Sequence, residues 1–92
     1  MAFLTIYTDD HYNGQKDELN SSDPALKHND QLTSFHLAIG RSAIFYNNVH
    51  YDGELFRVPG KYPNDCPGVN PEDNDKVSSI KVFSDPGFAN QV

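Results

Sequence analysis

The chain carries two copies of one sequence pattern, and this internal repeat constrains its fold more than any other feature. Residues 7–14 (YTDDHYNG) match residues 46–53 (YNNVHYDG) at Tyr, His, Tyr and Gly. Further along, residues 29–34 (NDQLTS) match residues 74–79 (NDKVSS). The two matches occur in the same order, offset by 39 and then 45 residues, and chance explains the pair far less well than either match alone. The sequence therefore predicts a tandem of two similar units of about 40 residues.

Each unit reads as short strands separated by turns. Runs rich in β-branched and aromatic residues occupy 3–8, 35–39, 43–46, 54–58 and 80–83. Turn-forming pairs such as Asn13-Gly14 and Asp52-Gly53 lie between them. No stripe with the period of a helix is visible, although 21–29 could hold one short helical turn. Six to eight short strands in 92 residues predict an all-β sandwich or barrel.

The length and composition indicate one small domain over residues 1–92 with a thin core. Apolar residues make up 37% of the chain, and a domain of this size buries only about 60–65% of its unfolded surface. The net charge of −6 argues against a nucleic-acid or anionic-membrane partner and favours a cation. No apolar run approaches the roughly 20 residues of a membrane-spanning helix, so we expect no membrane insertion. We expect a monomer, and the sequence does not indicate a compartment.

Several kinds of site are disfavoured by the residues that they would need. Cys66 is the only cysteine, so neither an internal disulfide nor a CxxC metal site can form. The four histidines lack the HxxxH or HExxH spacing of a zinc site. Residues 70–81 superficially resemble an EF-hand, but position 6 is Asp75 instead of Gly and position 12 is Lys81 instead of Glu. No catalytic constellation appears, so we do not expect an enzyme.

The repeated pattern resembles the Greek key signature of the βγ-crystallin family. That signature has an aromatic, four residues, an aromatic, one residue and a glycine, with a serine downstream. The hexapeptides 29–34 and 74–79 resemble the microbial calcium-binding version of the family: two Asn or Asp, two variable residues, Ser or Thr, then Ser. Residues 55–62 resemble the family's stretch leading into a tyrosine corner, which the first unit lacks. The resemblance covers residues 3 to about 83 and rests on two sets of positions: Tyr7, Tyr12, Gly14 and Ser34, and Tyr46, Tyr51, Gly53 and Ser79.

The resemblance implies a fold and a metal. The fold is a single βγ-crystallin-type β-sandwich of two intertwined four-stranded Greek keys, the first over about 3–40 and the second over about 42–85. The metal is calcium, with two ions bound at one end of the sandwich. In the family each ion draws on both hexapeptides.

The resemblance also implies the ligands of the two calcium ions. The third residue of a hexapeptide supplies a backbone carbonyl and the fifth a hydroxyl, while an Asn or Asp side chain reaches across from the other copy. A further carbonyl comes from the residue after the first aromatic of a hairpin. Which hairpin serves which site, and whether Asn29 and Asn74 ligate or only brace the loop, stay open. The other implied ligands are Thr8, Asp30, Gln31 and Thr33, with Asn47, Asp75, Lys76 and Ser78.

The chemistry of these residues agrees with calcium. Calcium takes six to eight hard oxygen ligands, and few charged ligands per ion imply micromolar affinity. Without the ion, Glu72 and Asp73 add negative charge close to Asp75, and we expect repulsion to loosen that end. The sequence thus predicts a non-enzymatic domain whose fold two calcium ions stabilise or induce. The alternative is a recognition module for a protein or a glycan in which calcium is purely structural.

Overall fold

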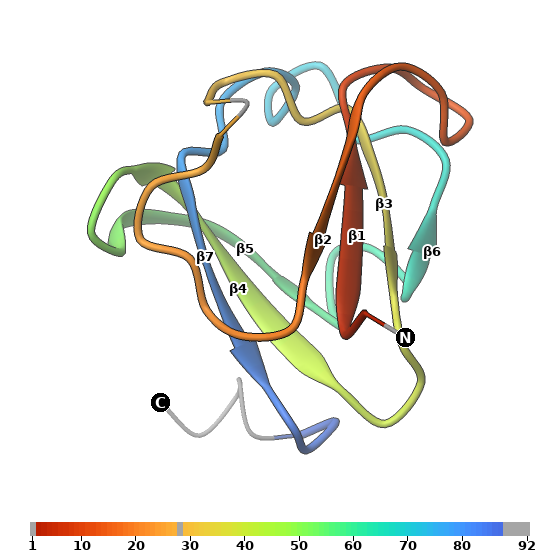
Figure 1. The fold of residues 1–92 in the computed structure, drawn as a ribbon, viewed down its shortest axis with the longest axis vertical. Helices are drawn as coiled ribbons and strands as arrows, with labels where there is room; N and C mark the ends of the chain where they lie inside the picture. Colours follow the sequence, from red (N-terminus) through yellow and green to blue (C-terminus); the bar gives the residue numbers. More distant parts are fainter. Residues whose placement is uncertain (1, 28, 88–92) are drawn as a thin grey trace.

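The computed structural model describes residues 2–27 and 29–87, in which seven strands form two antiparallel sheets. Figure 1 shows the sheets facing each other as a sandwich. The first sheet has the strand order β2-β1-β3-β6 and the second the order β5-β4-β7. No helix of the described residues is long and apolar enough to cross a membrane. The strands are β1 (Leu4–Tyr7), β2 (Lys16–Leu19), β3 (Ser34–Leu37), β4 (Ser42–Asn48), β5 (Asp52–Val58), β6 (Asp65–Cys66) and β7 (Ser79–Phe83).

The two repeats exchange a segment across the sandwich. The short strand β6, from the second repeat, pairs with β3 of the first repeat through Phe35 and His36. In the opposite direction, Asp23 of the first repeat forms an isolated antiparallel bridge with Ile80 on β7. This exchange confirms the predicted intertwined all-β sandwich. The difference is that the fourth strand of the second sheet is reduced to this one bridge.

The segment that could have held a helical turn contains this bridge instead. Asp23 N–H donates to the Ile80 carbonyl at 2.9 Å, and Ile80 N–H donates to the Asp23 carbonyl at 3.0 Å. These bonds use the backbone groups that a helix would need. Pro24 follows directly and disfavours a helical conformation for the residue before it. The described residues of 21–29 accordingly form a bridge and turns, without a helix.

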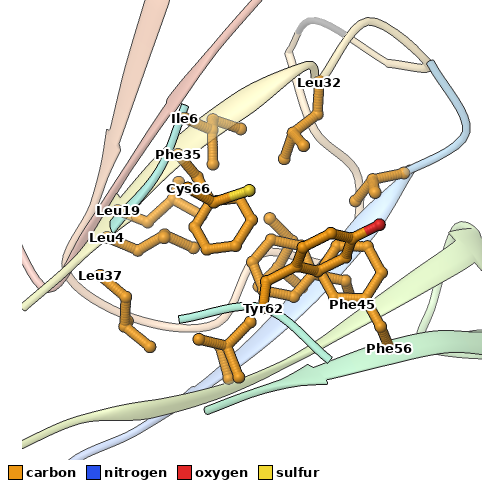
Figure 2. Packing of buried hydrophobic residues seen from close by; sticks show 14 of the residues in the cluster. Leu4, Ile6, Leu19, Leu32, Phe35, Leu37, Phe45, Phe56, Tyr62 and Cys66 are labelled. Carbon is orange, nitrogen blue, oxygen red and sulfur yellow. The ribbon is translucent and has the colours of Figure 1, made fainter. Parts of the chain in front are cut away.

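The centre of the core is aromatic (Figure 2). The rings of Phe45 and Phe56 stack with centroids 4.5 Å apart, and Phe35 lies 5.0 Å from Phe45. Tyr62 packs edge-on against Phe56 at 4.8 Å, with its hydroxyl at the rim of the cluster. Such contacts add about 0.5–1.5 kcal/mol per pair beyond the area that they bury. Aliphatic side chains from both sheets surround this centre: Leu4, Ile6, Leu19, Leu37, Val58 and Ile80.

The first hairpin folds over its own strands. The rings of Tyr7 and Tyr12 meet edge to face, 5.6 Å apart. Tyr12 has a φ of 61° and Gly14 a φ of 79°, the left-handed conformation that glycine adopts without strain. Ser34 Oγ then joins the hairpin to β3, because it donates to the Asp9 carbonyl at 2.6 Å and accepts from Tyr12 N–H at 3.1 Å.

The second hairpin repeats this arrangement closely. Tyr46 and Tyr51 meet edge to face at 5.8 Å, and Tyr51 and Gly53 again have positive φ, 59° and 74°. Ser79 Oγ donates to the Asn48 carbonyl at 2.6 Å and accepts from Tyr51 N–H at 3.0 Å. The repeated tyrosines, glycine and serine therefore mark one folded hairpin with its serine brace.

Candidate metal centre

The two hexapeptides meet at one end of the sandwich, at the top of Figure 1. Asp30 N–H donates to the Val77 carbonyl at 3.0 Å, and Asp75 N–H donates to the Leu32 carbonyl at 3.2 Å. In each case the second residue of one hexapeptide bonds to the fourth residue of the other. Leu32 and Val77 are buried, so they anchor both loops to the core. The backbone therefore crosses the two loops in the way that the resemblance implied for the side chains.

Both aspartates have left-handed backbones, with φ of 59° at Asp30 and 58° at Asp75. Asp and Asn adopt this conformation more readily than most residues, because their short polar side chains can hydrogen-bond locally. A reversal at the second residue turns each loop toward its partner. The requirement for Asn or Asp at this position is therefore partly conformational.

The Thr33 hydroxyl oxygen and two neighbouring oxygens form a cluster. Its hydroxyl Oγ1 lies 3.4 Å from Asp75 Oδ1 and 3.5 Å from the Gln31 carbonyl oxygen. The hydroxyl and the carbonyl come from the first hexapeptide, and the carboxylate comes from the second. We call this set the Thr33 cluster. It combines the third-residue carbonyl, the fifth-residue hydroxyl and the crossing carboxylate that the family resemblance implied.

The complementary Ser78 cluster has the same crossed pattern. Ser78 Oγ donates to Asp30 Oδ1 at 2.9 Å, so the hydroxyl of the second hexapeptide meets the carboxylate of the first. Lys76, two residues before Ser78, is exposed at the surface. Its ammonium can therefore remain in solvent, which leaves its backbone carbonyl as the group that would face a cation.

The hairpins lie next to the clusters of their own repeats. Thr33 N–H donates to the Tyr7 carbonyl at 2.9 Å, and Ser78 N–H donates to the Tyr46 carbonyl at 2.8 Å. Thr8 is the residue after Tyr7, whose carbonyl accepts this bond, so its backbone lies beside the Thr33 cluster. Asn47 has the same relation to the Ser78 cluster. This geometry pairs each hairpin with the hexapeptide of its own repeat.

The first residues of the hexapeptides differ in their surroundings. Asn29 is exposed, and its side-chain nitrogen lies 3.5 Å from Asp30 Oδ2. The Asn74 amide oxygen is buried and has no hydrogen-bond partner among the residues that the structure describes. Asn74 also braces the loop, because its N–H donates to the Asn70 carbonyl at 3.0 Å. A buried amide oxygen without a donor is available to a cation.

The donors of both clusters are hard oxygens. Each cluster combines one carboxylate with neutral hydroxyl or carbonyl oxygens, the ligand types that calcium accepts. Within 2–27 and 29–87, no group of three or more His, Cys, Asp or Glu side chains is placed to hold a metal. Carboxylate, hydroxyl and carbonyl oxygens suit calcium, whereas zinc and other transition metals favour His and Cys ligands. The residues therefore fit a hard, oxygen-seeking cation.

The sequence did not reveal a buried charge cluster beside the second hexapeptide. The Asp73 carboxylate is only 3% exposed and accepts a hydrogen bond from the Tyr62 hydroxyl. Lys61 Nζ lies 2.7 Å from Asp73 Oδ2 and 3.1 Å from Glu72 Oε1. The Tyr62 hydroxyl in turn accepts from Asn70 N–H at 2.9 Å. The expected repulsion from Glu72 and Asp73 is thus offset by Lys61. Among the described residues, no ion pair with a lysine or arginine offsets the charge of Asp30 or Asp75 on the crossed loops.

This cluster predicts a specific loss of stability in alkali. Burial raises the pKa of Tyr62 from 10.0 to about 12, and the hydrogen bond to Asp73 adds to the effect. Because the folded state holds this proton more tightly, its stabilising effect is complete below pH 10 and is lost as the pH rises toward 12. We expect the free energy of unfolding to fall by about 2–3 kcal/mol across that window. The hydrogen bond to Asp73 also raises the pKa of Lys61. The stability that the Lys61 charge contributes is therefore lost only as the pH rises above the pKa of a free lysine.

Tyr62→Phe isolates the tyrosine. The variant should be about 1–3 kcal/mol less stable at pH 7, because Asp73 loses a donor and Asn70 N–H loses an acceptor. It should also lose the tyrosine share of the alkaline decline. Urea denaturation from pH 8 to 12 measures both effects. Equal alkaline slopes in wild type and variant would contradict this assignment.

Fold and site together define a two-repeat Greek key sandwich with crossed polar loops, and solved structures share this fold. A βγ-crystallin domain from Flavobacterium johnsoniae is 30% identical, with a TM-score of 0.76 over 88% of this chain and 93% of that one. A βγ-crystallin domain from Clostridium beijerinckii is 28% identical, with a TM-score of 0.75 over 88% and 97%. The N-terminal domain of Protein S, at 23% identity and a TM-score of 0.74 over 90% and 97%, shares the fold.

No protein-family profile matches the sequence, and no curated protein is detectably similar to it. The identity to the Flavobacterium johnsoniae domain nevertheless extends over most of both chains. The chain belongs to the βγ-crystallin family.

Proposed function

We propose that this domain binds two calcium ions at its crossed hexapeptides and that the ions stabilise its fold. One observation carries the proposal: the fifth-residue hydroxyl of each hexapeptide faces the second-residue carboxylate of the other. Thr33 lies 3.4 Å from Asp75, and Ser78 lies 2.9 Å from Asp30. Two oxygen clusters of matching composition support two ions of the same kind.

The residues of each cluster divide into two ligand sets. The Thr33 cluster would hold one ion through the Gln31 carbonyl, the Thr33 hydroxyl and the Asp75 carboxylate, with Thr8 adjacent. The Ser78 cluster would hold the other through the equivalent groups. Bound calcium would offset the negative charge of the two carboxylates, and the Thr33 and Ser78 hydroxyls would present their oxygens to it. The second set is Lys76, Ser78 and Asp30, with Asn47 adjacent and the unpartnered amide oxygen of Asn74 on the same loop.

The proposed role is non-enzymatic. The residues at this end of the sandwich supply metal ligands, and the chemistry proposed for them is cation binding. A recognition role, in which calcium is purely structural, is compatible with the same two ions. Pull-down or glycan-array experiments with and without calcium distinguish the two roles.

Calcium should be strongly preferred to magnesium. Magnesium demands octahedral geometry at about 2.0–2.1 Å and sheds water reluctantly, whereas these clusters offer mostly neutral oxygens on loops. In an amide NMR titration, micromolar calcium should shift the Gln31, Thr33, Lys76 and Ser78 signals, and millimolar magnesium should leave the calcium-bound spectrum unchanged.

Two valine substitutions provide the matched comparison. Thr33→Val removes a proposed ligand at nearly constant shape, and Thr5→Val makes the same change on β1. The first should weaken calcium binding and the second should not. Displacement of calcium by magnesium, or equal affinities of the two variants, would count against the proposal.

A further inference from the structure

The second hairpin carries its own cation. Lys81, on β7, places its ammonium 5.1 Å from the ring centroid of Tyr51 and 5.9 Å from that of Tyr46. A lysine ammonium within about 6 Å of a tyrosine ring is attracted to the negative face of the π-system. The tyrosine pair of the second repeat is therefore partly covered by a lysine from the same sheet.

The first repeat has a histidine at the equivalent position. Tyr7 pairs with Ser34 in the first sheet as Tyr46 pairs with Ser79 in the second. His36 follows Ser34 by two residues, as Lys81 follows Ser79. The imidazole Nδ1 of His36 contacts the carboxylate of Asp65 on β6.

No lysine or arginine of the described chain lies over the rings of Tyr7 or Tyr12. The lysine nearest in register is Lys16, which stands opposite Tyr7 on β2. Lys16 Nζ lies 3.4 Å from Glu18 Oε1. Among the described residues, the first tyrosine pair therefore has no lysine or arginine in the place that Lys81 takes against the second pair.

A surface cavity of about 380 Å³ lies in front of the first tyrosine pair, lined by Tyr7, Tyr12, His36 and Asp65. Tyr12 is 38% exposed, whereas Tyr51 of the second repeat is partly buried. Burial raises the pKa of Tyr12, and the negative charge of Asp65 raises it further. The cavity thus combines two aromatic rings with a nearby carboxylate, which are the groups that recognise an organic cation.

We propose that this cavity binds an alkylammonium group, presented as a lysine side chain by a basic segment of a partner protein. The second repeat shows a lysine ammonium against the equivalent rings of the same fold. The net charge of −6 favours association with a basic partner. The cavity adjoins the Thr33 cluster through Tyr7, but the side chains that line it are not among the proposed calcium ligands, so the proposal does not rest on the proposed calcium function.

The first experiment uses n-butylammonium as the probe, with calcium present throughout. Amide NMR signals of Tyr12, His36 and Asp65 should shift on titration, and n-butanol, which lacks the charge, should leave them unmoved. Tyr12→Leu should weaken binding about fivefold. Tyr51→Leu, the matched change in the second hairpin, should leave the Tyr12 signals responding as in wild type.

Two further variants exchange the occupants of the two tyrosine pairs. His36→Lys gives the first pair its own ammonium and should abolish the response. Lys81→Met removes the ammonium from the second pair and should create a new response at Tyr46 and Tyr51. A response to butanol equal to that of butylammonium would overturn the proposal, as would unchanged binding in both His36→Lys and Tyr12→Leu.

The peptide experiment tests the source of the ammonium. An acetylated and amidated Gly-Lys-Gly peptide should produce the same shifts as butylammonium, and its norleucine counterpart should produce none. A site that responds to the free amine but not to the lysine peptide would contradict the assignment to a partner protein.

Discussion

Removing calcium should lower the melting temperature of this domain sharply and leave its amide NMR spectrum poorly dispersed. A ligand that binds only the folded state adds about 2.7 kcal/mol per site at a hundredfold excess over its Kd. Two sites would add about 5 kcal/mol, which equals the whole stability of many small domains. Because this core is small, calcium would supply much of the stability of the folded state.

The structure shows which end should loosen. Asp30 and Asp75 are exposed on the two crossed loops, while Asp73 and Glu72 are paired with Lys61. The loss of order without calcium should therefore begin at the hexapeptides, and the aromatic core should be the last part to lose order. Calorimetric melting in chelator and in excess calcium, with an NMR spectrum of each state, measures this. A well-dispersed spectrum in chelator and an unmoved melting temperature would contradict the prediction.

Asp75→Ala should weaken both calcium sites and remove most of the calcium-dependent stabilisation. The Asp75 carboxylate belongs to the Thr33 cluster, at 3.4 Å from the hydroxyl. Its backbone carries the second hexapeptide, and with it Lys76 and Ser78 of the other cluster. Alanine at a φ of 58° is strained by about 1–2 kcal/mol, so this hexapeptide is disturbed as well.

Asp75→Gly separates the two effects. Glycine accepts the positive φ without strain, so this variant loses the carboxylate while keeping the loop. It should weaken mainly the site that contains Thr33, whereas Asp75→Ala should weaken both. Calcium titrations followed at the Thr33 and Ser78 amides report the two sites individually. Loss of the Ser78 site in either variant, with the affinity of the Thr33 site unchanged, would refute the crossed arrangement.

The repeat predicted those parts of the structure in which the local conformation requires a particular residue type. Gly14 and Gly53 marked the positive-φ turns, and the paired tyrosines marked the folded hairpins. The hexapeptides were predicted to come together from opposite repeats, and the structure places them side by side. These positions are readable in sequence because few residue types can replace them.

Other parts left no such mark. β2 was not predicted, because its sequence is mostly polar: only Leu19 of its four residues is apolar and buried. β6 is two residues long, and pairing with β3 in the folded sheet defines it. Asp73 looked like one more surface carboxylate. It is buried because Tyr62 and Lys61 bind it. In the sequence, only Tyr62, at the end of the stretch that resembles a tyrosine corner, could have indicated this contact.

Isothermal titration calorimetry of calcium binding tests the central claim most directly. The wild-type domain should bind two calcium ions per chain with micromolar affinity, the range expected for sites rich in neutral oxygens. The double variant Thr33→Val, Ser78→Ala, which removes one hydroxyl from each cluster, should bind both ions much more weakly. A wild-type domain that takes up no calcium, or a double variant that binds two ions as tightly as wild type, would contradict the account.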